Sequence, residues 1–64
     1  MNLLTGTIEE IYTQEGITMG RVSIKGANVR VPLMFVPEAI VGDTVLIESG
    51  VAISRVQPQN IEEK

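Results

Sequence analysis

Residues branched at Cβ make up about a third of this 64-residue chain, with eight Ile, eight Val and five Thr against four Leu and three Ala. Branching at Cβ restricts side-chain rotation in a helix, but it suits the pleated, half-buried surface of a sheet. Six glycines and three prolines divide the chain into short segments, a spacing typical of a small barrel or sandwich. The sequence therefore predicts one small all-β domain.

Five short strands are expected, each bounded by turn residues. They cover residues 5–12, 17–25, 28–31, 44–49 and 51–56. The alternation of apolar and polar residues predicts that these side chains face inward: Ile8, Val22, Ile24, Val29, Val31, Val45 and Ile47. Five short strands are too few for two large sheets, but they are enough for a small closed or nearly closed barrel. We expect an OB-like barrel, with an SH3-like barrel as the alternative.

Two regions depart from strand alternation. Gly20 lies within the second expected strand, where a missing side chain indicates a bulge or a sharp bend. Residues 33–41 fit neither the strand nor the helix period, and Pro37 predicts an irregular connection with one helical turn over 37–39. We expect a barrel domain over residues 1–57, followed by a frayed acidic tail at 58–64.

The chain contains no Cys and no His. This excludes disulfides, thiolate nucleophiles, imidazole bases and the usual ligands of zinc and soft iron. Eight acidic residues against five basic ones give a net charge of −3, which disfavours binding to the negatively charged backbone of a nucleic acid. The longest apolar run, residues 33–36, is far too short to span a membrane, and residues 1–4 do not resemble a signal peptide. We expect a cytoplasmic protein that binds neither nucleic acid nor membrane.

The carboxylates show no arrangement for catalysis or metal binding. Glu9 and Glu10 are adjacent on an expected strand, so their side chains should point to opposite faces. Glu62 and Glu63 lie in the tail, and Asp43 is expected to hydrogen-bond within its own turn. The sequence therefore predicts no enzymatic activity, no metal site and no cofactor.

A weak basic patch is expected on the second and third strands, where Arg21, Lys25 and Arg30 can share one outer face. Binding of single-stranded nucleic acid combines a basic groove with stacking aromatic residues. The chain has only two aromatic residues, Tyr12 and Phe35. We therefore interpret the patch as an ordinary solvated face.

Apolar residues exceed what so small a barrel can bury. The surplus lies at strand ends or in the irregular segment: Leu3, Leu4, Leu33, Met34, Phe35 and Val36. Some of them should cap the barrel ends, which is the interpretation we favour for Phe35. Any exposed remainder would form a patch suited to a protein partner, with Met34 as an adaptable contact. The surplus favours a binding module.

The fourth and fifth strands carry a pattern that resembles a known family. Residues 41–54 read Val-Gly-Asp-Thr-Val-Leu-Ile-Glu-Ser-Gly-Val-Ala-Ile-Ser, similar to the signature of the HypC/HupF family of hydrogenase maturation chaperones. Val36-Pro37-Glu38 resembles a further family segment, and residues 6–11 resemble its first strand. The resemblance extends over about residues 1–57.

This resemblance implies a small OB-like barrel with a C-terminal helix, which binds a scaffold protein, HypD, and the immature large subunit of nickel–iron hydrogenase. In the family, a Cys directly after the initiator Met helps to pass on an iron that carries cyanide and carbon monoxide. Asn2 stands at that position here, Glu48 stands where a His is frequent, and little chain remains for the helix. An Asn amide is a poor substitute for a thiolate on iron. The resemblance thus supports docking rather than iron carrying.

We therefore expect an accessory or chaperone-type protein that docks onto a hydrogenase-type large subunit or a HypD-like scaffold without ligating iron. The residues expected to bind the partner lie at one end of the barrel: Asn2, Leu3 and Leu4, with Met34 and Phe35 beside them. The alternative is a structural subunit that self-associates, or joins a larger complex, through the same apolar residues. A homo-oligomer is compatible with either hypothesis.

Overall fold

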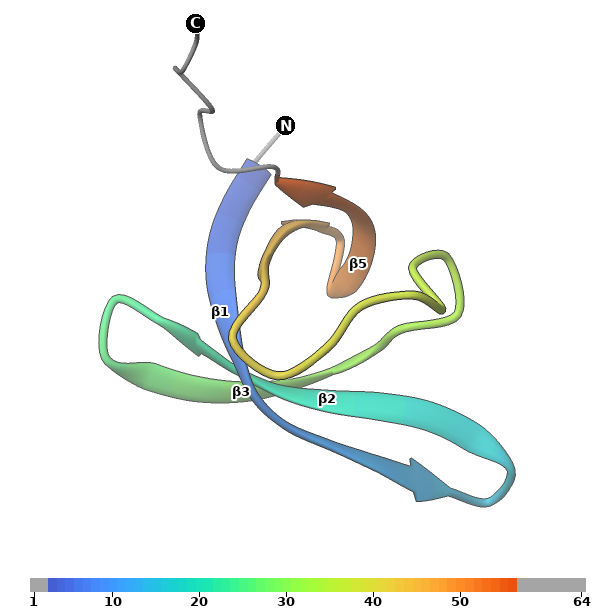
Figure 1. Cartoon of the computed structure of the whole chain (residues 1–64). Helices are drawn as coiled ribbons and strands as arrows, with labels where there is room; N and C mark the ends of the chain where they lie inside the picture. The colour runs from blue at the N-terminus through green and yellow to red at the C-terminus, as the bar shows by residue number, and fades with distance from the viewer. Residues whose placement is uncertain (1–2, 57–64) are drawn as a thin grey trace, which may run out of the picture.

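The computed structural model describes residues 3–56, which form one antiparallel sheet of five strands (Figure 1). The strands are β1 (Leu3–Gln14), β2 (Ile17–Ile24), β3 (Ala27–Pro32), β4 (Thr44–Glu48) and β5 (Val51–Val56). Their order across the sheet is β3-β2-β1-β4-β5. The expected all-β class and the five strands are confirmed.

The sheet curls because β1 pairs with different neighbours along its length. Residues 3–7 of β1 pair with β4, whereas its residues from Thr7 onward pair with β2. The two outermost strands, β3 and β5, are thereby brought into contact. No backbone ladder joins them within residues 3–56. The outcome is a curled sheet of the OB-like kind whose last two edges meet without strand pairing.

Three hairpins are closed by two-residue loops of the same type. In the β2–β3 loop, Lys25 and Gly26 have φ angles of 52° and 86°, and the loops at residues 15–16 and 49–50 have a similar pair of positive values. Such type I′ turns match the twist of the flanking strands and favour Gly in the second position. The turns expected at these glycines are confirmed.

A β-bulge at Glu9 explains why the apolar residues of β1 do not alternate strictly. The register with β2 shifts between Ile8 and Glu10, so that Glu9 is the extra residue. Ile8 is therefore buried, and Ile11, three residues later, also packs against the core. Because of the extra residue, Ile8 and Ile11 both face the core although they are three positions apart, a spacing that a regular strand does not allow.

Gly6 and Gly20 leave room for neighbouring side chains in the interior. A Cβ atom at Gly6 would collide with Val22 and Ile24, and one at Gly20 would lie 3.0 Å from Cδ1 of Leu33. The pairing of Gly20 with both neighbouring strands is regular, so of the bulge and the sharp bend expected there, the bulge is absent. The register shifts of the sheet lie in β1 and in the pairing of β4 with β5 instead. Both glycines allow close packing rather than a change of register.

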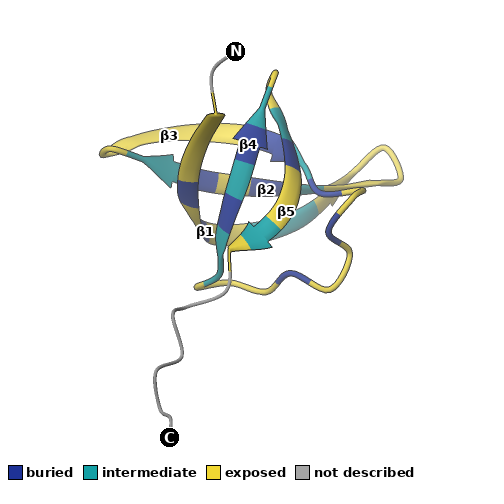
Figure 2. Cartoon of the chain, turned by 90° about the horizontal axis from the view of Figure 1, so that it is seen from above, coloured by how far each residue is buried: buried dark blue, intermediate teal, exposed yellow. Residues whose placement is uncertain are grey.

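The core lies on the concave side of the sheet, and Figure 2 marks buried segments on β1, β2 and β4. Its buried residues are Ile8, Val22, Val31, Leu33, Val36, Ala39, Val45, Ile47 and Ala52. The expected inward positions are confirmed, except that Ile24 is only partly buried and Val29 is 37% exposed. Val29 lies between the β2–β3 hairpin loop and the buried Val31, so only the part of β3 farther from that loop enters the core.

The connection between β3 and β4 consists of successive reverse turns. Val36 N donates to Leu33 O, Ala39 N to Val36 O, and Asp43 N to Ile40 O, each at 3.0 Å. Leu33, Val36 and Ala39 are buried, whereas the residues between them face outward. A burial period of three fits neither a strand nor a helix, and the single helical turn expected in this segment is wrong.

The described residues do not include Asn2 or the tail at 58–64, so those two expectations lie outside the structure, and the domain boundary at residue 57 stays a prediction. No helix in residues 3–56 is long and apolar enough to cross a membrane.

Candidate docking site

Leu3 and Leu4 begin β1 and pair with Glu48 and Ile47 at the end of β4. Cross-strand partners share a face of the sheet, so Leu4 lies on the concave side together with the buried Ile47. Leu4 is nevertheless 42% exposed, and Leu3, on the opposite face, is 49% exposed. This end of the sheet therefore presents one exposed leucine on each face.

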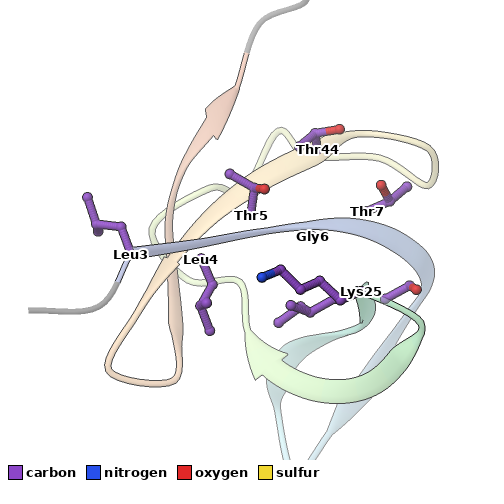
Figure 3. Close-up of a pocket in the computed structure, with 9 residues that line it drawn as sticks. Leu3, Leu4, Thr5, Gly6, Thr7, Lys25 and Thr44 are labelled. Atoms are coloured by element: carbon purple, nitrogen blue, oxygen red, sulfur yellow. The ribbon is translucent and has the colours of Figure 1, made fainter.

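A cleft of about 380 Å³ runs along the edge of β1 beside these leucines (Figure 3). It is lined by residues 3–7 of β1, residues 23–25 of the β2–β3 hairpin and Thr44 of β4. The ladder between β1 and β2 begins only at Thr7↔Ser23, so residues 3–6 pair with β4 alone. The cleft opens where β2 turns away from β1.

The lining of the cleft suits binding better than catalysis. Leu4 and Lys25 extend toward one another from opposite walls, whereas Leu3 and Thr5 point to the other side of β1 (Figure 3). The remaining lining side chains are mostly hydroxyls and Ile24, and none of the lining residues is a carboxylate. The cleft offers an apolar contact, one cation and a strand edge, without an acid–base pair.

Met34 and Phe35 lie on a different part of the molecule. They form the first turn after β3, where the N–H of Leu33 donates to the carbonyl of Thr18 at 2.9 Å, near the β1–β2 hairpin loop. Met34 is 57% and Phe35 63% exposed. The continuous apolar end expected from the sequence is therefore wrong, because this turn lies near the opposite end of β1 from the two leucines. The exposure of Phe35 also contradicts its expected role as a cap.

Several further exposed apolar residues were missed by the sequence analysis, and the most exposed of them are Ile40 and Val41. Ile40 and Val41 are 61% and 56% exposed, and they belong to the last turn of the connection. The signal that would have found them is the three-residue spacing of Leu33, Val36 and Ala39.

Asp43 fixes the end of the connection to the sheet. Its Oδ2 accepts hydrogen bonds from the backbone N–H of Ile40 at 3.0 Å and from Nε of Arg55 at 2.9 Å. Its carbonyl accepts from the N–H of Ile8 at 2.9 Å. The Ile40 hydrogen bond, with a further contribution from Arg55, holds the pKa of Asp43 below its ordinary value. The expected hydrogen bond within its own turn is confirmed.

The expected basic patch is only partly brought together. Arg21 and Arg30 lie directly opposite each other on β2 and β3, and Nη1 of Arg21 lies 3.0 Å from Oε1 of Glu10. Lys25 lies in the hairpin loop and lines the cleft beside Leu4 instead. Within residues 3–56, no group of three or more acidic side chains converges as metal ligands would.

The comparisons with known proteins agree with the pattern in β4 and β5. The model of the HupF/HypC family matches residues 4–64, nearly the whole chain. No curated protein and no solved structure gives a significant match. The extent of the family match shows that this chain belongs to the HupF/HypC family of hydrogenase maturation chaperones.

Proposed function

We propose that the chain docks onto a nickel–iron hydrogenase-type large subunit, or onto its HypD-like maturation scaffold, through the first residues of β1. The observation that carries the proposal is the cleft beside the exposed Leu3 and Leu4. Asn2 directly precedes these residues in the sequence and is part of the proposed contact. Met34 and Phe35 would form a second, separate contact.

The resemblance to the family supports docking at this end of the sheet. Asn2 corresponds to the family's Cys, and Glu48 corresponds to its frequent His. Glu48 pairs with Leu3, so it lies beside the beginning of β1. Leu3 lines the cleft, so the departure at Glu48 lies next to a lining residue.

The cleft provides two kinds of contact for a partner. The edge of β1 at residues 3–6 faces the cleft without a paired strand, so an extended partner segment can add main-chain hydrogen bonds there. Leu3 and Leu4 are each about half exposed. Burying the exposed parts of both leucines would contribute about 1.5–3 kcal/mol in total. The main-chain contacts and the two leucines together provide a modest docking affinity.

We further propose that the chain does not itself ligate the iron that hydrogenase maturation handles. Its sequence contains neither Cys nor His. Soft thiolate and imidazole ligands suit iron, whereas an Asn amide is a weak, hard ligand. In this proposal the iron is cargo held by the partner, and the chain contributes binding.

Co-purification from the native host tests the docking proposal. The tagged wild-type chain should recover a hydrogenase-type large subunit or a HypD-like scaffold, and Leu4→Glu should lose it. Ile53→Glu is the matched control, because Ile53 is 38% exposed on β5 and belongs neither to the lining of the cleft nor to the turn at Met34 and Phe35. Phe35→Ser should weaken recovery less than Leu4→Glu does. Recovery of neither partner by the wild type, or full recovery by Leu4→Glu, would contradict the proposal.

Self-association is the second candidate, and the extent of exposed apolar surface favours it. Ten large apolar residues among residues 3–56 are at least 37% exposed, many for so small a chain. A second copy of the chain would cover part of that surface. Sedimentation of the purified chain at micromolar concentration should then show a dimer or larger species, and a stable monomer would exclude this candidate.

A further inference from the structure

A row of charged residues crosses the outer face of β1, β2 and β3. Glu10 pairs with Arg21, and Arg21 pairs with Arg30, so the three side chains follow one another across neighbouring strands. Nη1 of Arg21 lies 3.0 Å from Oε1 of Glu10. Within residues 3–56, Arg30 has no ion-pair partner. The row therefore holds two guanidinium groups and one carboxylate.

An open cleft of about 410 Å³ lies over this row, lined by Glu10, Tyr12, Arg21 and Arg30. The hydroxyl of Tyr12 is buried and has no hydrogen-bond partner in the part of the chain that the structure describes. A buried hydroxyl without a partner is unfavourable and uncommon. The cleft therefore carries an excess of positive charge, and an unpartnered hydroxyl is buried in its wall.

The two arginines create a local electrostatic problem that an anion would relieve. Like charges directly opposite each other on neighbouring strands destabilise a sheet. The carboxylate of Glu10 neutralises the charge of Arg21 only, because it lies on β1, on the side of Arg21 away from Arg30. A guanidinium group binds a carboxylate through paired, charge-assisted hydrogen bonds. An oxyanion placed between Arg21 and Arg30 would complete the alternation of charge along the row.

We propose that Arg21, Arg30 and Tyr12 form a binding site for a carboxylate side chain of an acidic protein segment. Arg30 is the main contact, and Tyr12 lines the wall of the site. A nucleic acid fits the site less well, because the cleft offers a single aromatic residue on which a base could stack. This cleft shares no lining residue with the one beside Leu4, so the inference does not depend on the proposed function.

Titration of the full chain with a short acidic peptide, followed by NMR of the arginine Nε–H and backbone amide signals, tests the site. The probe is acetyl-tetraglutamate amide, and the tetraglutamine peptide is its neutral counterpart. The acidic peptide should shift the signals of Arg21 and Arg30 in a saturable manner, and added salt should weaken its binding. The glutamine peptide should leave those signals unchanged.

Three variants assign the binding to this row of charges. Arg30→Gln should weaken binding by up to about fivefold, the upper end of the range for one exposed ion pair. Lys25→Gln makes the same change in net charge at the other cleft, and it should alter binding less than about twofold. Glu10→Gln should strengthen binding severalfold, because it frees Arg21 for the peptide. The backbone amide spectra of the variants report whether each one is folded.

Several results would overturn the inference. No saturable shift with the acidic peptide, or an equal response to the glutamine peptide, would show that the row binds no carboxylate. Equal losses in Arg30→Gln and Lys25→Gln would show unspecific attraction. A thymidine octanucleotide that shifts the same arginine signals at lower concentration than the acidic peptide would assign the cleft to nucleic acid instead.

Discussion

The two parts of β1 differ in exposure although they belong to one strand. Leu4 and Ile8 both pair with buried residues, Ile47 and Val22, yet Leu4 is 42% exposed and Ile8 only 1%. The N–H of Ile8 donates to the carbonyl of Asp43, so the β3–β4 connection meets the strand there. Leu4 instead lines an open cleft. What surrounds each position, rather than the residue type, decides whether an apolar side chain becomes core or docking surface.

A large effect is expected at Gly6, which lies between the two parts of β1. A Cβ atom there would collide with Val22 and Ile24, so Gly6→Ala should lower the free energy of unfolding by about 3 kcal/mol, the upper end for overpacking. Gly20→Ala is the matched control and should cost about 1 kcal/mol, because its Cβ meets only the end of the Leu33 side chain. Urea denaturation measures both values. If the two variants lost the same free energy of unfolding, Gly6 would not be packed closely against Val22 and Ile24.

Truncating the two inward residues compares the two parts of β1 directly. Ile8→Ala should lower the free energy of unfolding by about 2–4 kcal/mol, because it leaves a cavity in the core. Leu4→Ala should cost less than about 1 kcal/mol, since its side chain is partly exposed. Urea denaturation again provides the measurement. A loss at Leu4 as large as that at Ile8 would show that the cleft is filled by packed side chains.

The anchoring of the connection beside Ile8 predicts a pH dependence. Asp43 has a pKa below its ordinary value of 3.8, so its carboxylate stabilises the fold fully above that pH. This contribution should disappear as the pH falls through the lower, folded-state pKa. In Asp43→Asn, denaturation between pH 5 and pH 2 should show a weaker loss of stability than in the wild type. An equal loss of stability in Asp43→Asn and in the wild type over this range would contradict the contribution of the Asp43 carboxylate.

The smallest effect is expected at Tyr12, in the second part of β1. Its buried hydroxyl lacks a partner within residues 3–56, so Tyr12→Phe should leave the stability unchanged or raise it by up to about 1 kcal/mol. Tyr12→Ala should destabilise the chain, because it also removes the ring. Thermal unfolding compares the two variants. A marked loss in Tyr12→Phe would indicate that the hydroxyl is hydrogen-bonded.

The regular hairpins could be predicted from the sequence because their turns are local. A glycine after Glu15, Lys25 and Ser49 provides the positive φ that a type I′ turn needs. A two-residue loop at Lys25 and Gly26 also fixes the register of β2 with β3, and therefore places Arg21 opposite Arg30. The charged row was thus predictable, although the sequence analysis grouped Lys25 with it.

The bulge and the connection could not be predicted because they depend on distant contacts. Glu9 is an ordinary strand residue in sequence, and it becomes the extra residue only where β2 and the turn at Gly42 meet β1. The connection buries every third residue, a period that neither the helix nor the strand template detects. Its exposed turn at Met34 and Phe35 is separated from Leu3 by the topology of the sheet, which single-strand patterns do not encode.

Hydrogen–deuterium exchange on a complex with the hydrogenase-type large subunit or the HypD-like scaffold tests the central claim most directly. If residues 3–7 of β1 form the docking edge, the partner should slow exchange at residues 3–7 and 23–25 and leave residues 9–14 unchanged. Protection confined to residues 9–14, or to the turn at Met34 and Phe35, would contradict the division of β1 into a docking part and a structural part.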